Sequence, residues 1–161
     1  MKTKKYKIRK DLSYTFDGHK LYRVEALKDF GDVKKGSIGG FLEKEDNLSQ
    51  EGNCWVYLDA KVYDNAKVFG NSVIDGHAQV CDNAIVFDNA QVKGYSKIKD
   101  NTRVYGNARI WDNSIVKDNA QVYSNSLLLE NAQVCDVLIL VLMEDTLREK
   151  RNFTKRFRYW S

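Results

Sequence analysis

Hydrophobic residues recur every six positions through most of the chain, from Val56 to Val134. In each group of six, the first residue is Val, Ile or Leu, and the fifth is Ala, Ser or Thr. A helix needs apolar residues at a period near 3.6, so a six-residue spacing cannot keep them on one helical face. Short β-strands separated by turns fit the pattern, because β-branched residues favour strands. The pattern therefore predicts stacked short strands over residues 50–139.

The third and fourth residues of each hexad supply the predicted turn. They are mostly Asp-Asn or Gly-Asn, as at Asp64-Asn65 and Gly70-Asn71. Asn, Asp and Gly tolerate positive φ more readily than other residues, so the same turn is expected at every corner. Such a unit cannot bury its inner face alone, and successive coils must stack to form a continuous core.

The hexads resemble those of left-handed parallel β-helix proteins, a group that includes bacterial acyltransferases. The resemblance implies a left-handed helix with three hexads per triangular coil, and about five coils in all. Residues 21–56, which begin LYRVEALKDFGDVKKGSIGG, also resemble the opening block of short, largely uncharacterised hexapeptide-repeat proteins from phages, prophages and bacteria. We predict an all-β fold: a left-handed parallel β-helix with an N-terminal β-hairpin and cap and a short C-terminal cap.

Both ends of the chain depart from the repeat. Residues 1–49 are expected to form a β-hairpin that turns at Asp17-Gly18, followed by a capping region. Residues 140–161 are basic and aromatic and are expected to form a C-terminal cap or tail. Basic side chains among aromatic ones could instead grip single-stranded nucleic acid. Cap packing is favoured over that interpretation, whose candidate residues are Arg151, Lys155, Arg156 and Arg158.

Two columns of side chains are expected on the outside of the β-helix, because residues one coil apart stack at about 4.8 Å. The first column is aromatic, and the second is acidic and occupies one corner. The aromatic column either stiffens the rod or forms the interface of a homo-oligomer, a dimer or trimer. The Asp side chains either cap the turn backbone or form a negative stripe for a basic partner, with a cation site as a minor alternative. The columns comprise Phe69, Phe87, Tyr105 and Tyr123, and Asp64, Asp82, Asp100, Asp118 and Asp136.

Few residues suit catalysis or metal binding. Cys54, Cys81 and Cys135 lack the CxxC spacing, and with only two histidines no common zinc pattern can be assembled. We interpret the cysteines as structural or incidental and His19 as a surface residue, and we expect neither metal nor cofactor. His77 is an isolated candidate for the histidine base that the acyltransferase resemblance implies. Since no loop interrupts the hexads from Val56 to Gln133, nothing inserted there could shield a reaction from water, and an enzyme is not favoured.

The sequence favours a non-catalytic protein-binding module of phage or mobile-element origin. It would act as an inhibitor of a host defence system, similar to an anti-CRISPR, by docking its acidic or aromatic face on a host protein or nucleoprotein complex. The alternatives are an acyltransferase-like enzyme and a structural, self-assembling module. The chain shows no signal peptide and no apolar run of membrane-spanning length, so we expect no membrane contact and a cytoplasmic location in the bacterial host. Direct binding of nucleic acid is not favoured.

Overall fold

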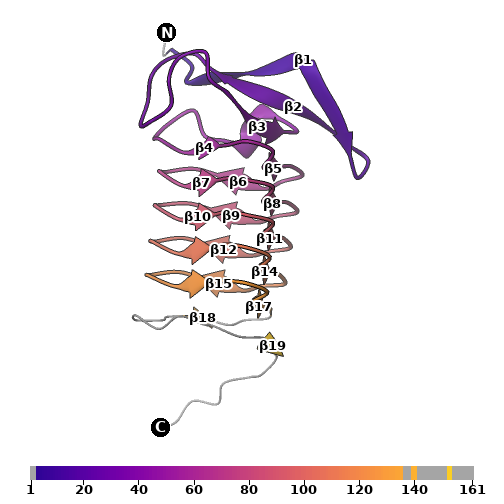
Figure 1. Cartoon of the computed structure of the whole chain (residues 1–161), viewed down its shortest axis with the longest axis vertical. Coiled ribbons are helices and arrows are strands. Elements are labelled where there is room, and N and C mark those ends of the chain that lie inside the picture. Colours follow the sequence, from indigo (N-terminus) through magenta and orange to yellow (C-terminus); the bar gives the residue numbers. More distant parts are fainter. Residues whose placement is uncertain (1–2, 136–138, 141–151, 154–161) are drawn as a thin grey trace.

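The fold is a β-solenoid that stands beneath an N-terminal hairpin and cap (Figure 1). The computed structural model describes residues 3–135, 139–140 and 152–153. Three parallel sheets run along the rod, and each coil contributes one two-residue strand to each sheet. Paired residues are one coil apart, as Val62 is with Val80. The predicted all-β parallel β-helix of about five coils is confirmed, and its form is consistent with the left-handed type.

The strands of each sheet follow one another at intervals of one coil. The first sheet of the rod holds β5 (Lys61–Val62), β8 (Gln79–Val80), β11 (Lys97–Ile98), β14 (Ile115–Val116), β17 (Gln133–Val134) and then β19 (Asn152–Phe153). The second holds β4 (Trp55–Val56), β7 (Val73–Ile74), β10 (Gln91–Val92), β13 (Arg109–Ile110) and β16 (Leu127–Leu128). The third holds β6 (Lys67–Val68), β9 (Ile85–Val86), β12 (Arg103–Val104), β15 (Gln121–Val122) and β18 (Ile139–Leu140).

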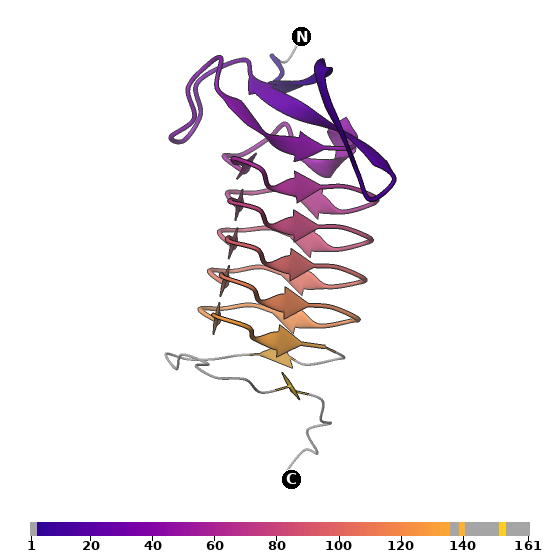
Figure 2. The ribbon, with the colours of Figure 1, turned by 45° about the vertical axis from the view of Figure 1, so that its right-hand side comes forward.

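The N-terminal region continues the first sheet beyond the rod. The hairpin consists of β1 (Tyr6–Phe16) and β2 (His19–Ala26), and β2 pairs in turn with β3 (Ile38–Leu42). β3 then pairs in parallel with β5, so stacking on the rod already begins at residues 38–42. A single 3₁₀ turn, η1 (Glu45–Asn47), leads into the coils. The hairpin leans over one side of the first coils (Figure 2).

The inside of the rod is formed by the residues that the hexad pattern predicts. First-position residues such as Val80 and Ile98 and fifth-position residues such as Ala84 are fully buried. The third position adopts positive φ, with Asp64 and Asp82 both at 56°, as the repeated Asp-Asn and Gly-Asn pairs predicted. The hairpin turn is also confirmed: Asp17 and Gly18 have φ of 48° and 82°, the two positive values that a type I′ turn requires.

The fourth position of the hexad forms ladders of asparagine side chains. Asn65 Nδ2 donates to Asn83 Oδ1 at 3.3 Å, and Asn83 donates in the same way to Asn101 at 3.1 Å. At the top of this ladder the buried Asn47 donates to the backbone oxygens of Asp64 and Ala66. At this corner each coil therefore presents the next one with the same side-chain donor and acceptor.

The upper end of the rod is closed by the N-terminal segment. Tyr6 is buried there, and its hydroxyl lies within hydrogen-bond distance of the backbone oxygens of Leu48 and Glu45, at 2.6 and 2.8 Å. Close approach of β3 to the first coil needs glycine, because a Cβ on Gly40 would lie 2.6 Å from the oxygen of Ala60. This region thus covers the open end of the core.

Candidate functional site

A second hydrophobic cluster fastens the hairpin to the side of the rod. Leu21, Phe41 and Tyr63 are buried in it, and Phe16 and Cys81 pack against them. The rings of Phe16 and Tyr63 meet edge to face with their centroids 6.0 Å apart. The cluster joins side chains of the hairpin, of β3 and of the first two coils. It therefore holds the tip of the hairpin against the rod.

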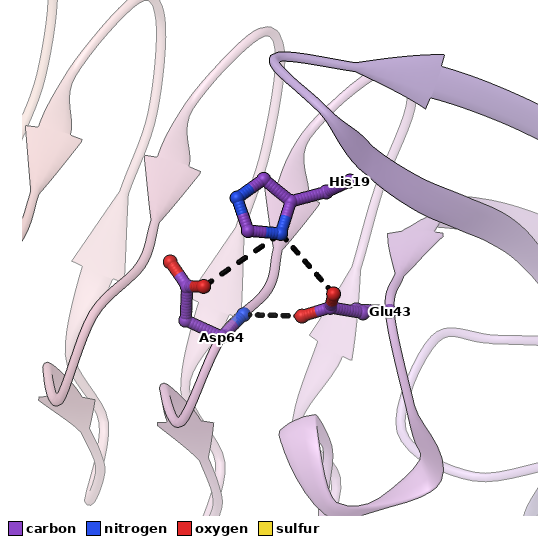
Figure 3. Close-up of side chains that lie close together, drawn as sticks. All are labelled: His19, Glu43 and Asp64. Atoms are coloured by element: carbon purple, nitrogen blue, oxygen red, sulfur yellow. Dashed lines mark hydrogen bonds and ion pairs between the residues drawn. The ribbon is translucent and has the colours of Figure 1, made fainter.

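His19, the first residue of β2, lies between two carboxylates (Figure 3). Its Nδ1 is 3.1 Å from Glu43 Oε1 and 3.6 Å from Asp64 Oδ1, and its ring packs on Tyr63 with the centroids 4.8 Å apart. When Nδ1 carries the hydrogen and donates it to Glu43, the neutral imidazole keeps its lone pair on Nε2. Within the described residues Nε2 has no hydrogen-bond partner, and it lies on the ring edge away from Glu43 (Figure 3).

Glu43 connects the hairpin to the corner of the rod. It directly follows β3, and its own N–H donates to the oxygen of Val62 at 3.2 Å. Its Oε2 accepts the backbone N–H of Asp64 at 2.7 Å, while Oε1 faces His19. The hydrogen bond with Glu43 raises the pKa of His19, against a smaller opposing effect of burial. Burial disfavours the charged form of Glu43, but its two hydrogen bonds outweigh this and leave its pKa below the ordinary value.

An open pocket of about 450 Å³ adjoins this pair, bounded by the hairpin tip and the first sheet of the rod. Its carboxylates and His19 belong to the tip and to the first two coils, whereas its lysines belong to the third coil. One end of the pocket is therefore acidic and the other basic. The lining residues are Asp17, His19, Tyr63, Asp64, Gln79, Cys81, Asp82, Lys97, Lys99 and Ile115.

Cys81 lines the same pocket as a thiol and not as a thiolate. Burial raises its pKa to about 11, and the neighbouring Asp82 adds to the effect, although the hydroxyl of Tyr63 opposes it. The thiolate is the nucleophilic form of cysteine, so at neutral pH Cys81 is poorly suited to attack a substrate. Burial likewise raises the pKa of Cys54, which lies at 0% exposure at the top of the core. These positions agree with the structural interpretation of both cysteines.

Two groups of side chains bring together atoms that could hold a metal ion. Ligand atoms of His19, Glu43 and Asp64 lie within 4.8 Å of one another, as do those of Asp64, Cys81 and Asp82. The hydrogen bonds that already link these residues explain their clustering without an ion. Sequence spacing gave no sign of the first group, because its three members come from the hairpin, from the end of β3 and from a coil corner.

The predicted acidic column is present, and its side chains bond to the backbone of the next coil. The Oδ2 atom of Asp64 accepts the N–H of Asp82 at 3.2 Å, Asp82 accepts that of Asp100 at 2.9 Å, and Asp100 accepts that of Asp118 at 2.9 Å. These hydrogen bonds correspond to capping of the turn backbone, one of the two main alternatives for the Asp side chains. Only Asp64 and Asp82 reach the pocket, and Asp136 lies outside the described residues.

The other predicted site residues lie elsewhere. Phe69, Phe87, Tyr105 and Tyr123 stack with neighbouring centroids 5.0, 4.9 and 5.1 Å apart, and an oligomer interface on this column stays a prediction. The basic residues Arg151, Lys155, Arg156 and Arg158 are outside the described part of the chain.

His77 is exposed and stacks on Tyr95, away from the pocket. The sequence predicts His77 as the isolated candidate for a catalytic histidine and His19 as a surface residue. The structure pairs His19 with a carboxylate instead, and does not place His77 at the pocket. The Asp17-Gly18 turn located His19 on a hairpin. Nothing in the sequence indicated the position of Glu43 opposite it.

The repeat is similar in sequence to that of a known bacterial protein. The sequence model described as the YdcK β-solenoid repeat matches residues 78–94. The chain is also 37% identical over 83 residues to "Uncharacterized acetyltransferase YdcK" of Escherichia coli strain K12. That alignment covers 47% of this chain but 24% of the relative, so the chain spans about a quarter of that protein's length.

These similarities overturn the function favoured by the sequence. The prediction of a non-catalytic anti-defence binder, similar to an anti-CRISPR, is wrong: the relative is named as an acetyltransferase, in line with the alternative of an acyltransferase-like protein. A phage origin and an anti-CRISPR role have no support, and the prediction that the chain is not an enzyme is not supported. None of the described helices is long and apolar enough to cross a membrane. The repeat, the coil-to-coil pairing and the two similarities fit a hexapeptide-repeat β-helix.

Proposed function

We propose that this protein is an acyltransferase-like enzyme in which His19 acts as the general base. The single observation that carries the proposal is the hydrogen-bonded pair of His19 and Glu43 at the acidic end of the pocket. A carboxylate on Nδ1 fixes the tautomer and the orientation of an imidazole whose Nε2 then accepts a proton from the reacting group. The acetyltransferase name of the similar protein from Escherichia coli supports the reaction class.

The N-terminal hairpin answers the main objection to an enzyme. The uninterrupted hexads offer no inserted loop, but Asp17 and His19 at the hairpin tip line the pocket together with Cys81 and Asp82 of the second coil. A wall built by a separate element can cover the reacting atoms as an inserted loop would. Such a wall shields one side of the open pocket from water, and this partial shielding strengthens the electrostatic interactions beside it.

The reaction requires an acceptor and a thioester donor. The acceptor's nucleophilic atom attacks the thioester carbonyl, a bond to the acyl carbon forms, and the carbon–sulfur bond breaks. His19 Nε2 receives the proton of the nucleophile and returns it to the departing sulfur, which leaves as the thiol. Glu43 is a positioning residue here: it holds His19 and stabilises the imidazolium that forms.

The proposal is tested by thiol release from acetyl-coenzyme A in the presence of a panel of amines and alcohols. The variant His19→Gln removes the base but keeps a polar side chain of similar size. We expect kcat to fall by about 10²- to 10⁴-fold, the contribution of a general base. His77→Gln is the matched control and should keep the wild-type rate, because His77 lies outside the pocket. Equal rates for His19→Gln and wild type would rule out this role, and absence of thiol release with every acceptor would rule out the reaction class.

A further inference from the structure

The charges of the pocket are separated along the axis of the rod. His19 and Asp64 stand at the first coil, Asp82 at the second, and Lys97 and Lys99 at the third. Strands of neighbouring coils are about 4.8 Å apart, so the two ends are separated by about 10 Å. The volume of about 450 Å³ lies within the range of small-molecule sites. A ligand with opposite charges at its two ends would match this arrangement.

The acidic end is preorganised to receive a cation. Asp64 and Asp82 each commit one carboxylate oxygen to a backbone N–H of the next coil, at 3.2 and 2.9 Å, which fixes the position of the charge. Asp17 at the hairpin tip adds a third carboxylate to the lining. Carboxylates around a base attract an ammonium group, whereas a neutral hydroxyl gains little from them. The chemistry at this end therefore selects an amine over an alcohol.

The basic end offers two lysines to an anion. In the described part of the chain neither Lys97 nor Lys99 forms an ion pair. Lys117, one coil beyond Lys99 in the same column, lies 3.9 Å from Asp118 and does not line the pocket. The two unpaired lysines thus coincide with the pocket, and one further lysine, Lys117, follows in the column of Lys99.

We propose that the acyl acceptor is a primary amine that also carries an anionic group about 10 Å from its nitrogen, two strand spacings away. This inference rests on the proposed function. The ammonium binds at Asp64 in the first coil, two strand spacings from the lysines, and loses one proton to His19 Nε2. The resulting free amine attacks the thioester carbonyl. A carbon–nitrogen bond forms and the carbon–sulfur bond breaks, while the second proton lost by the nitrogen passes to the departing sulfur. The products are an amide and a free thiol, and the proton held by His19 is released to solvent. Lys97 and Lys99 hold the anionic group and set the specificity.

Three acceptors with the same six-carbon chain test the inference with the full-length protein and acetyl-coenzyme A. They are 6-aminohexyl phosphate, 6-aminohexan-1-ol, which lacks the anion, and 6-hydroxyhexyl phosphate, which lacks the amine. We expect kcat/KM for 6-aminohexyl phosphate to exceed both others by at least about tenfold, roughly the worth of one good charged contact. The double variant Lys97→Ala with Lys99→Ala should raise KM for 6-aminohexyl phosphate and abolish its advantage over 6-aminohexan-1-ol. The control variant Lys117→Ala should keep the wild-type KM for 6-aminohexyl phosphate and the advantage of this acceptor over 6-aminohexan-1-ol.

The outcomes separate this inference from the proposed function. Equal kcat/KM values for 6-aminohexyl phosphate and 6-aminohexan-1-ol overturn the inference and leave acyl transfer intact. If calorimetry without donor shows lysine-dependent binding of 6-aminohexyl phosphate, but no acceptor releases thiol, the proposed function fails, and with it the role of the amine as acceptor.

The donor could also supply the anion, because coenzyme A carries phosphates. S-acetylpantetheine, which has none, distinguishes the two sources. If the double variant raises KM for acetyl-coenzyme A but not for S-acetylpantetheine, the lysines bind the donor, and the acceptor inference is overturned. An unchanged KM for both donors, with KM for 6-aminohexyl phosphate raised, supports it.

Discussion

The rod and the hairpin of this protein are stabilised in different ways. In the rod every coil repeats the contacts of its neighbours: a buried aliphatic residue, a small residue beside it, and an Asp or Asn bonded one coil on. The hairpin depends instead on single contacts between distant segments, such as the cluster of Leu21, Phe41 and Tyr63. In the rod equivalent packing contacts recur from coil to coil, whereas the contacts that hold the hairpin are not repeated. The candidate site lies where the two regions meet.

The largest effect is expected from a cavity in the rod. Ile98 is fully buried in the third coil, and Ile98→Ala should lower the free energy of unfolding by about 2–5 kcal/mol. Chemical denaturation followed by circular dichroism measures this loss. Ile85→Ala, at a half-buried position on the outer face, is the matched control and should cost less. Equal losses for the two variants would show that the shaft is not the main source of stability.

Leu21→Ala tests the hairpin in the same terms. Leu21 is fully buried, but its hydrophobic cluster is small. We therefore expect a loss of about 2 kcal/mol in free energy of unfolding, at the low end of the range for a Leu→Ala substitution. The loss should appear as opening of the hairpin and not as unfolding of the rod, because no coil depends on it. Hydrogen exchange should rise in β1 and β2 and stay unchanged in β8 to β14. Acyl transfer should fall with it, as His19 would leave Glu43. Faster exchange throughout the rod would mean that the two regions unfold together.

A single rung of the asparagine ladder should matter less. Asn101 accepts from Asn83 at 3.1 Å and donates to Asn119 at 3.3 Å on the exposed side of the corner. We expect Asn101→Ala to cost about 1 kcal/mol in thermal or chemical unfolding. Asn113 has the same hexad position but makes no side-chain hydrogen bond among the described residues, so Asn113→Ala should cost less. Identical losses would assign the preference for Asn to the turn itself and not to the ladder.

The pH dependence of the site should be the most local effect. Glu43 raises the pKa of His19, so Glu43→Gln should move the titration of His19 to lower pH, as nuclear magnetic resonance of its ring protons would show. The acid limb of kcat/KM should move in the same direction, since the base must be unprotonated. A raised pKa in the folded state stabilises the fold below the pKa of the unfolded chain, and this contribution is lost as pH rises through the folded value. Protection of the hairpin amides from hydrogen exchange should therefore weaken slightly with increasing pH in the wild-type protein but not in the Glu43→Gln variant.

The sequence predicted the rod well because its determinants are local. Each position of the hexad has its own conformational preference, as the aliphatic Val80, the small Ala84 and the turn residues Asp82 and Asn83 show. Because the hexad recurs many times, a departure at one position does not obscure the pattern. The candidate site has no such signature. His19 and Glu43 are separated by 24 positions, and their contact depends on the register of β2 on β3 and of β3 on β5. Pairing across irregular segments cannot be derived from hexads, and the histidine that the sequence offers as a catalytic candidate is therefore His77, inside the repeat.

The coil-to-coil bonding has a consequence for how the chain can change length. The pocket uses the hairpin and the coils down to Ile115, while the coils below continue the same contacts without contributing to it. Duplicating residues 117–134 would insert one more coil, with every donor and acceptor matched, and lengthen the rod by about 4.8 Å. The lower rod therefore behaves as an adjustable spacer, whose length can vary independently of the chemistry at the other end.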